Sequence, residues 1–393
     1  MKERGQEKST PFSDDLIFGI FFRLPVKSLL RFMCLSNSWS KVIADSQFFA
    51  LQLHHSKQSN KEFLLQISEN PLKLQSISSC PNGLHLKPEI LEPQSTSLYG
   101  RKWSIVGSYN GVLCLWNSTT PQPCRQLAFL NPSIKKLKLL PLSPACLPTY
   151  HHHPSVTVEV EFGFGYDSST NDFKVVRILY ESQHWRWKQV HVYSLKNNLW
   201  TTLTNLANPL PSYHLLYPRA VVNGAFTCLA SKVSPGFLIL SFNFDNETFE
   251  ENKLPDYFHG LTSKHYDIVG MMEVKGRLSL LFEFPKLSHF AYFEKMAKLE
   301  LWMMVQKSVW AKHLVFHWTL HPIHHWIVMN DPEMLLLTQT HFLSNYNVET
   351  LTTSDFGVVD FAYPLHVAAA AAAPYTPSLA LLGDPGASEW NEV

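Results

Sequence analysis

The sequence predicts an α+β multidomain chain, in which a small helical module at the N-terminus precedes a larger all-β body. Apolar residues recur at helical spacing over residues 14–53, and beyond them the pattern changes to short runs close to strict alternation. Charged residues make up only 17% of the chain, whereas proline and the aromatic residues are plentiful, which is typical of strands joined by turns. A chain of 393 residues has room for one large domain and one small one.

The helical module is indicated by capping residues as well as by periodicity. Asp14 and Asp15 place negative charge on the first helical turn, where the helix dipole favours it. Pro25 suits the first turn of a second helix, and Asp45 or Ser46 can cap a fourth. The first helix carries apolar residues on more than one face, and about 40 residues are too few to bury all of them. We therefore expect the surface of a partner to cover the excess.

The order of residues within this module resembles a known family. RLPVKSLLRF at residues 23–32 is followed by C-x-S-x-S-W at residues 34–39. The whole series resembles the F-box, the adaptor-binding module of substrate receptors in Skp–cullin–F-box ubiquitin ligases, in the form common in plants. One departure is Phe12-Ser13, where the family usually has Leu-Pro. The alternative is a helical cap packed on its own domain.

The resemblance implies a set of residues that face the adaptor, and through the adaptor a cullin. This set consists of apolar residues at the family's positions: Leu16, Ile20, Phe21, Leu24, Pro25, Leu30, Cys34 and Trp39.

The body contains a recurring strand–turn–strand unit, often with a tryptophan on its second strand. The unit occupies residues 190–203, 238–255 and 299–312, and more faintly 342–353, at an irregular spacing close to that of kelch-type blades. Each hairpin exposes two edges and half a core, so its neighbours must cover it, and a closed ring achieves this for every unit. We predict a kelch-like all-β propeller with five or six blades, counted from the segment near Gly107.

Several pieces of the body resemble the F-box-associated domain of plant F-box proteins. They include GSYNGVLCL at residues 107–115, LNPS at 130–133, FGFGYD at 162–167 and LWMM at 301–304, and they cover about half of the chain. In FGFGY the third glycine of a phosphate loop is missing, so we predict a closely packed strand there. The predicted organisation is a flexible N-terminus (1–10), the F-box (11–55), a connecting segment (56–100), the F-box-associated β-propeller (101–366) and a disordered low-complexity tail (367–393).

A histidine-rich stretch provides the alternative of a metal-dependent propeller enzyme. His313, His317 and His321 are spaced by four, so on a helix they would share one face. However, the aromatic and β-branched residues from Trp310 to Trp318 favour a strand, and no acidic or cysteine partner stands at ligand spacing. We therefore predict no metal, no cofactor and no catalytic residue. A divergent family member without ligase function is a further alternative.

Composition excludes other classes of protein. The net charge of +1 gives no electrostatic footprint for nucleic acid or an anionic membrane, and no apolar run approaches the ~20 residues of a membrane span. The N-terminal stretch MKERGQEKSTPFSDD lacks the apolar core of a signal peptide. The six cysteines are scattered, as expected of reduced thiols. We expect the protein in the cytoplasm, the nucleus or both.

Recognition of a target protein is expected on loops of the propeller, because loops on a rigid scaffold commonly carry binding residues. The candidates are Trp185, Trp187, His152 and Tyr257. Aromatic packing at a hairpin tip is the alternative role for the two tryptophans. The resemblance implies a non-catalytic substrate-recognition subunit, whose F-box binds a Skp adaptor and whose propeller binds a target protein.

Overall fold

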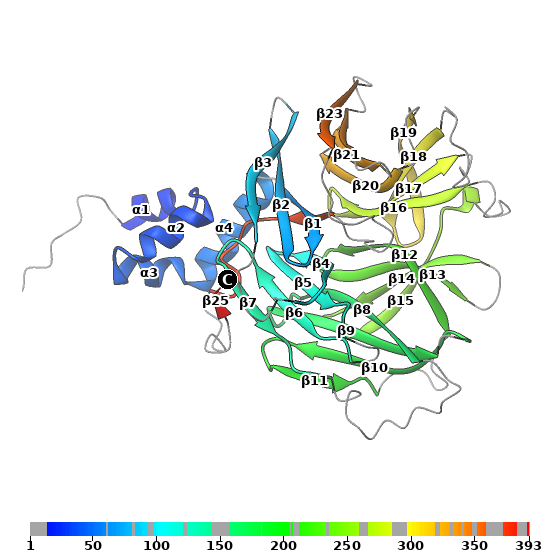
Figure 1. The fold of residues 1–393 in the computed structure, drawn as a ribbon, viewed down its shortest axis with the longest axis horizontal. Helices are drawn as coiled ribbons and strands as arrows, with labels where there is room; N and C mark the ends of the chain where they lie inside the picture. The colour runs from blue at the N-terminus through cyan, green and yellow to red at the C-terminus, as the bar shows by residue number, and fades with distance from the viewer. Residues whose placement is uncertain are drawn as a thin grey trace, which may run out of the picture.

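A ring of β-sheets follows a group of short helices in the computed structural model of the chain (Figure 1). The structure describes residues 14–59, 62–80, 83–92, 98, 100–120, 124–143, 158–181, 183–204, 206, 212–232, 236–258, 266–284, 297–318, 323–330, 333–338, 342–347, 352–358, 372–382 and 391–392. The helices are α1 (Asp14–Phe21), α2 (Val26–Met33), α3 (Asn37–Ile43) and α4 (Ser46–Ser59). The predicted helical module is therefore confirmed.

Side-chain hydrogen bonds cap α3 and α4, whereas α2 begins without one. Pro25 is the N-cap residue of α2, in extended conformation just before the first turn, one position earlier than predicted. The Ser36 hydroxyl accepts a hydrogen bond from the backbone N–H of Ser38 and caps α3. Asp45 Oδ1 accepts from the backbone N–H groups of Gln47 at 2.9 Å and Phe48 at 3.2 Å. Asp45 is thus the residue that caps α4.

The strands form six sheets among the described residues, each an antiparallel meander. The first three sheets in chain order contain β1 (Glu62–Glu69), β2 (Leu72–Cys80) and β3 (Gly83–Leu91); β4 (Trp103–Tyr109), β5 (Val112–Asn117), β6 (Leu127–Asn131) and β7 (Lys136–Leu139); and β8 (Val158–Asp167), β9 (Asp172–Glu181), β10 (Arg186–Ser194) and β11 (Leu199–Thr202). The next three contain β12 (Tyr213–Val222), β13 (Ala225–Lys232), β14 (Phe237–Asn243) and β15 (Thr248–Lys253); β16 (Asp267–Val274), β17 (Arg277–Phe284), β18 (Ala297–Gln306) and β19 (Val309–Trp318); and β20 (Ile323–Asn330), β21 (Glu333–Thr338), β22 (Phe342–Asn347) and β23 (Thr352–Val358). Two short strands, β24 (Ala372–Tyr375) and β25 (Asn391–Glu392), and the 3₁₀ turn η3 (Asp256–Phe258) complete the fold.

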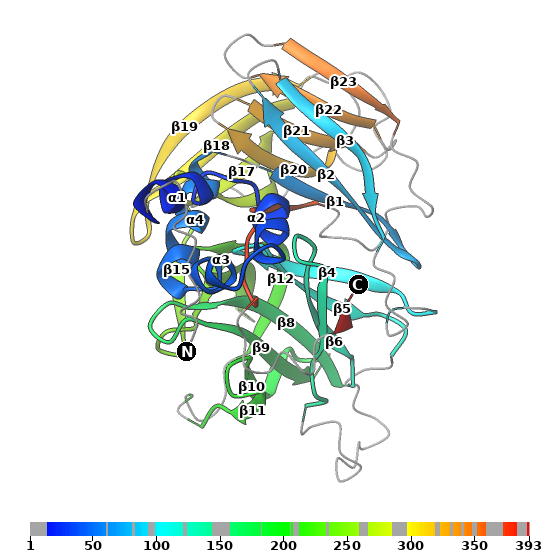
Figure 2. The same ribbon diagram turned by 90° about the vertical axis from the view of Figure 1, so that its left-hand side faces the viewer.

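The sheets are the blades of a six-bladed propeller, within the predicted range of five or six. The first strands of successive blades contact one another around the ring: β4 contacts β8, β12 contacts β16, and β16 contacts β20. The recurring hairpins of the sequence are the third and fourth strands of blades three to six. Seen from the side of the helices, the strands surround the centre of the molecule and the helices lie in front of them (Figure 2).

The ring is closed by strands from the two ends of the chain. β24 pairs with β1 and becomes the innermost strand of the first blade, in the order β24-β1-β2-β3. The predicted connecting segment at 56–100 is therefore wrong, because residues 62–91 form three strands of that blade. The predicted disordered tail is wrong for residues 372–382, which contain β24 and buried side chains. β1, β2 and β3 pair with one another over short distances in the chain, whereas β24 depends on a pairing between residues about 310 positions apart.

Two of the hairpin tryptophans bind the backbone of the preceding blade. Trp200 Nε1 on β11 donates to Pro141 O at 2.8 Å, just beyond β7. Trp310 Nε1 on β19 donates to Lys253 O at 2.9 Å, at the end of β15. In both cases the outermost strand of one blade is joined to the exit of the blade before it. This contact explains why tryptophan recurs at this point of the hairpin.

Glycine is required where elements approach too closely for a side chain. A Cβ at Gly163 would lie 2.3 Å from the ring of Phe226, and a Cβ at Gly165 would lie 2.1 Å from Gly224 O. The close packing predicted for FGFGY is confirmed, and it joins blade three to blade four. At the β4–β5 turn, Gly111 has φ +80, and a Cβ there would lie 2.3 Å from Ser378 Oγ.

The segment 376–382 connects the helical module to the propeller. Asn131 Nδ2 donates to the carbonyl oxygens of Ser378 at 3.2 Å and Ala380 at 2.9 Å. Ser378 Oγ donates to Asn110 O at 2.6 Å. Leu379, which is 3% exposed, belongs to the core of the helical module, and Ile134 from the β6–β7 turn packs against the same core. The helices therefore lie at the end of the blades that carries the β4–β5 turn, which contains Asn110, and the β6–β7 turn. We refer to this end as the helix-side end.

Candidate binding surfaces

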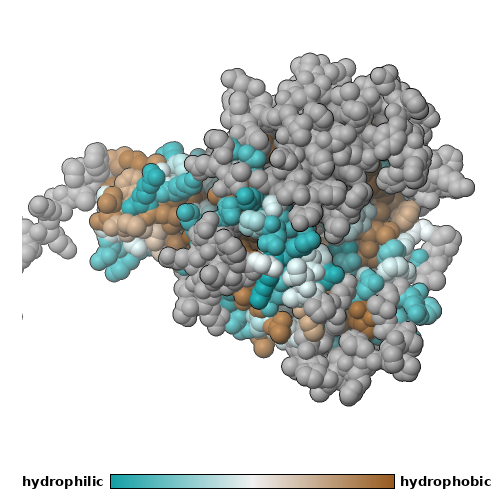
Figure 3. Space-filling view, in the orientation of Figure 1, coloured by the Kyte–Doolittle hydropathy of each residue, from teal (hydrophilic) through white to brown (hydrophobic). Residues whose placement is uncertain are grey.

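The first helix exposes one apolar face. Leu16 and Ile20 lie one helical turn apart and are 57% and 52% exposed. The opposite face packs inward: Phe18 meets Phe48 edge to face at 5.4 Å, and Phe21 is 3% exposed. Figure 3 shows apolar residues gathered on the surface of the helical module. A large apolar surface of this kind is typical of a protein–protein interface.

The structure divides the predicted adaptor-facing set into three groups. Leu16, Ile20, Pro25 and Cys34 are exposed, and Leu24, Leu30 and Trp39 are half-buried. The assignment of Phe21 to the surface is wrong, because its ring lies in the module's core between Phe32 at 5.1 Å and Trp39 at 5.5 Å. Helical spacing alone does not distinguish the buried face of α1 from the exposed one when both are apolar.

Two further exposed apolar residues of the helical module were not included in the predicted adaptor-facing set. Leu35, which is 72% exposed, follows α2, and Val42 is exposed on α3. The signal that could have found Leu35 is an apolar residue between a helix end and the Ser36 cap, where burial is not required. Part of the apolar excess is covered by the propeller itself, through Leu379, Leu382 and Ile134. The expectation that a partner protein covers the apolar excess of the helical module was therefore incomplete, since the chain's own C-terminal segment covers part of it.

The candidate target-binding residues lie at the other end of the blades, called here the far end. β8 and β12 begin at this end, and the β9–β10 turn and η3 lie there because strand direction alternates within each blade. Trp185 occupies the β9–β10 turn and stacks on His214 with ring centroids 3.6 Å apart. Tyr257 in η3 is 56% exposed and stacks on Trp302 at 5.8 Å. His152 lies outside the described residues.

The assignment of Trp187 to a binding surface is wrong. This side chain is 1% exposed, and its Nε1 donates to Tyr213 O at 3.3 Å. Its ring packs against Phe249 of the next blade at 4.8 Å. Trp185 has φ +53, so the alternation of the strand begins only after it, and the two tryptophans have different environments. The alternative role, aromatic packing at the hairpin, is correct for Trp187.

A cluster of charged and aromatic residues from three blades lies at the far end. Arg219 Nη1 on β12 donates to Glu161 Oε2 on β8 at 2.6 Å. Tyr180 OH on β9 donates to Glu159 Oε2 at 2.9 Å, and burial together with Glu161 and Glu159 raises the pKa of Tyr180. Arg125, which precedes β6 of the second blade, is placed close enough for both carboxylates to influence its pKa. Sequence reasoning did not single out these residues, because they are far apart in the chain.

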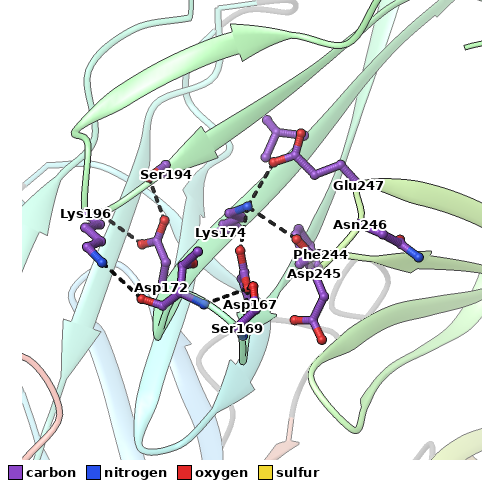
Figure 4. A network of polar contacts seen from close by, with 12 residues as sticks. Asp167, Ser169, Asp172, Lys174, Ser194, Lys196, Phe244, Asp245, Asn246 and Glu247 are labelled. Carbon is purple, nitrogen blue, oxygen red and sulfur yellow. Dashed lines mark hydrogen bonds and ion pairs between the residues drawn. The ribbon is translucent and has the colours of Figure 1, made fainter. Parts of the chain in front are cut away.

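The acidic residues at the helix-side end are already engaged with their neighbours (Figure 4). Lys174 Nζ is 2.9 Å from both Asp167 Oδ2 and Glu247 Oε1, and so links blade three to blade four. Asp172 accepts from Ser194 Oγ at 2.5 Å and from the backbone N–H of Lys196 at 2.9 Å. Burial opposes ionisation of Asp167, but hydrogen bonds from Ser169, Lys174 and Thr170 outweigh it and hold its pKa well below the usual range. This network stabilises two hairpins and links two blades, so its role is structural.

The histidine-rich stretch forms a strand, as its residue types indicated. His313 and His317 lie on β19, and four residues along a strand span about 13 Å, too far for both to bind one ion. His321 lies outside the described residues. The part of the chain that the structure describes contains no group of three or more histidine, cysteine, aspartate or glutamate residues placed to hold a metal ion. Of the described helices, none has the length and apolar character needed to cross a membrane.

Comparison with known proteins agrees with both parts of the fold. The F-box domain family matches residues 12–51, and the F-box associated beta propeller domain family matches residues 62–342. The chain is 28% identical to F-box protein CPR1 of Arabidopsis thaliana over 322 residues, which is 76% of this chain and 71% of that protein. It is 29% identical to an F-box/kelch-repeat protein of the same plant over 239 residues, 59% of this chain and 62% of the relative.

Among solved structures, the chain is similar to TolB from Acinetobacter baumannii, with a TM-score of 0.41 and 11% identity over 76% of this chain and 63% of that one. The family match begins at β1, in agreement with the position of the first blade. The chain belongs to the family of proteins that combine an N-terminal F-box with an F-box associated β-propeller domain.

Proposed function

We propose that this chain is the substrate-recognition subunit of a Skp–cullin–F-box ubiquitin ligase. The F-box binds a Skp-type adaptor, the adaptor connects the chain to a cullin, and the propeller binds the target protein. The observation that carries this proposal is the apolar face of α1, where Leu16 and Ile20 remain exposed although the module has its own core. Such a surface is stabilised by a protein partner that buries it.

The subunit acts without chemistry of its own. Its contribution is to hold a target close to a ubiquitin-conjugating enzyme, and holding two reactants together can supply several kcal/mol of the barrier. The separation of the helix-side end from the far end supports this role, because a target on the far end leaves the F-box surface free. We place the complex in the cytoplasm, the nucleus or both, which a fluorescent fusion of the full chain would test.

The proposal is tested by measuring adaptor affinity with purified full-length protein. The double variant Leu16→Ser with Ile20→Ser removes the exposed apolar face without touching the module's core. Truncating an interface anchor typically costs about 2 kcal/mol, so we expect roughly a thirtyfold or greater loss of affinity. Isothermal titration with a plant Skp adaptor gives this value directly.

A matched control distinguishes the interface from general surface effects. Leu51 on α4 is 48% exposed and lies outside the predicted adaptor-facing set, so Leu51→Ser should bind the adaptor as the unmodified chain does. Leu24→Ala with Pro25→Ala tests the neighbouring, half-buried part of the same surface and should also lose affinity. Failure of the unmodified chain to bind any Skp adaptor would refute the proposal. So would an unchanged affinity in the Leu16 and Ile20 variant.

A further inference from the structure

Arg125 at the far end has a guanidinium that stacks on an aromatic ring and whose Nε atom has no hydrogen-bond partner. Its Cζ lies 3.9 Å from the centroid of the Trp116 ring on β5. Stacking of this kind fixes the plane of a guanidinium and leaves its edge available for other contacts. Arg125 Nε is buried and has no hydrogen-bond partner in the structure. An unsatisfied buried donor of this kind is destabilising in the free protein.

The two carboxylates that influence the pKa of Arg125 are hydrogen-bonded to other residues. Glu161 binds Arg219 and Glu159 accepts from Tyr180, so neither satisfies Arg125. Burial lowers the pKa of Arg125, and the attraction of Glu161 and Glu159 only partly opposes this. The free chain therefore leaves the cost of desolvating this guanidinium incompletely offset. A carboxylate at the partly exposed edge of the guanidinium would offset part of this cost through its charge, without reaching the buried Nε.

Aromatic side chains flank the same cluster. Trp185 and His214 form a stacked pair, and the electrostatic influence of Glu161 and Glu159 on His214 places this pair beside the charged groups. Tyr217, which is 55% exposed, lies under Arg219 with 4.1 Å between Cζ and the ring centroid. A peptide bound here would meet a charged anchor with aromatic contacts beside it.

We propose that Arg125 is the anchor for a carboxylate side chain of the target protein, at the end of the propeller away from the F-box. This inference rests on the proposed function, because it names the chemistry by which the propeller recognises its target. A carboxylate matches the planar fork of arginine and accepts two parallel hydrogen bonds. The positive charges of Arg125 and Arg219 are balanced by the negative charges of Glu159 and Glu161. These two carboxylates repel a doubly charged phosphate more strongly than a singly charged carboxylate, so the cluster suits the carboxylate better.

The test compares three pools of heptapeptides with random flanking positions. The central residue is aspartate in the first pool, asparagine in the second and phosphoserine in the third. The full chain is immobilised through an N-terminal tag, so that peptide capture does not depend on the adaptor. We expect the aspartate pool to be retained roughly tenfold more strongly than the asparagine pool, as is typical for a charge-assisted hydrogen-bond pair.

Arg125→Gln should abolish this preference, and Arg125→Lys, which keeps the charge without the fork, should reduce it. Arg101→Gln is the matched control, because Arg101 is an exposed arginine just before β4 at the same end of the second blade. It should retain the preference. Thermal unfolding of each variant verifies that the propeller is intact.

Four results would overturn the proposal: equal retention of the aspartate and asparagine pools, no retention of either, an unchanged preference in Arg125→Gln, or stronger retention of the phosphoserine pool. Adaptor affinity is measured on the same preparations. A chain that prefers the aspartate pool but binds no adaptor would refute the ligase role while leaving the carboxylate anchor intact. A chain that binds the adaptor but shows no preference for the aspartate pool would refute the carboxylate anchor and leave the ligase role intact.

Discussion

Single residues in this propeller are constrained by how closely neighbouring blades approach. At Gly165 a Cβ would lie 2.1 Å from a backbone oxygen, and backbone cannot move aside as a flexible side chain can. We expect Gly165→Ala to lower the free energy of unfolding by about 1–3 kcal/mol or more, which is the usual cost of overpacking. Urea unfolding measures this difference.

Gly19→Ala provides the control at the residue scale. A Cβ at Gly19 would meet only Arg23 Nη1, at 3.8 Å, and alanine favours a helix over glycine. This variant should be as stable as the unmodified chain or slightly more stable. Equal stability of Gly165→Ala and the unmodified chain would show that the blades are not in contact there.

A buried histidine should make stability depend on pH. Burial, together with the nearby Arg177, lowers the pKa of His191 from 6.5 to about 4. Between these two values the unfolded chain binds the proton and the folded chain does not, so acidification destabilises the fold. The expected loss from His191 is about 3 kcal/mol across that window. Glu283 acts in the opposite sense, because burial and then Asp267 raise its pKa to about 7.

The contribution of His191 is isolated by comparing the unmodified chain with His191→Gln. Both are unfolded in urea at about pH 7 and about pH 4.5, and the unmodified chain should lose about 2–3 kcal/mol more than the variant on acidification. Glu283 contributes equally to both proteins and cancels in the difference. An identical pH dependence would mean that His191 is not held neutral in the fold.

At the scale of the residue, residue types and their order in the sequence predicted local features better than they predicted which side chains are buried. The turn at Asn110-Gly111 followed from turn chemistry, whereas Leu16 and Ile20, which are exposed, were assigned to the adaptor-facing set by the resemblance to the F-box. The burial of Phe21 and Trp187 was not predicted, because both depend on which surface another element covers. Arg125 gave no signal at all, since the carboxylates that influence it, Glu159 and Glu161, come from blade three.

Among the elements, the C-terminal segment has the widest influence. β24 completes the first blade, Leu379 enters the core of the F-box, and Asn131 donates to the backbone on both sides of Leu379. Deleting residues 367–393 should therefore open the ring and loosen the F-box together. The loss of buried Tyr375 and Leu379 alone is expected to cost on the order of 5 kcal/mol.

The control for this deletion is a shorter one, of residues 383–393, which removes β25 but keeps β24 and Leu379. It should unfold at nearly the same temperature as the full chain, because β25 contributes only two paired residues at the edge of the second blade. Differential scanning calorimetry measures both. Similar unfolding temperatures for the two deletions would show that β24 does not close the ring.

Element prediction succeeded where the sequence repeats and failed where it does not. The hairpins of blades three to five were recognised because each has its own turn and aromatic residues. The innermost strand of the first blade, Ala372–Tyr375, was missed because it lies at the end of a run of alanines that has no strand signal of its own. Only the geometry of a closed ring requires a strand there.

At the scale of the whole molecule, the F-box and the far-end cluster lie at opposite ends of the blades. The F-box contacts the β6–β7 turn and the C-terminal segment, and α4 extends over the β4–β5 turn, where Lys57 Nζ lies 4.9 Å from the Tyr109 ring. Arg125, Trp185 and Tyr257 lie at the ends of strands that point away from these turns. The architecture therefore separates the adaptor surface from the proposed target surface.

Hydrogen–deuterium exchange of the full chain, alone and with a saturating Skp adaptor, tests this separation most directly. The adaptor should slow exchange in peptides that cover α1, α2 and α3. It should leave unchanged the peptides that contain Arg125, the β9–β10 turn and η3. Protection of those far-end peptides by the adaptor, or no protection of the helices, would contradict the account of a receptor with two separate surfaces.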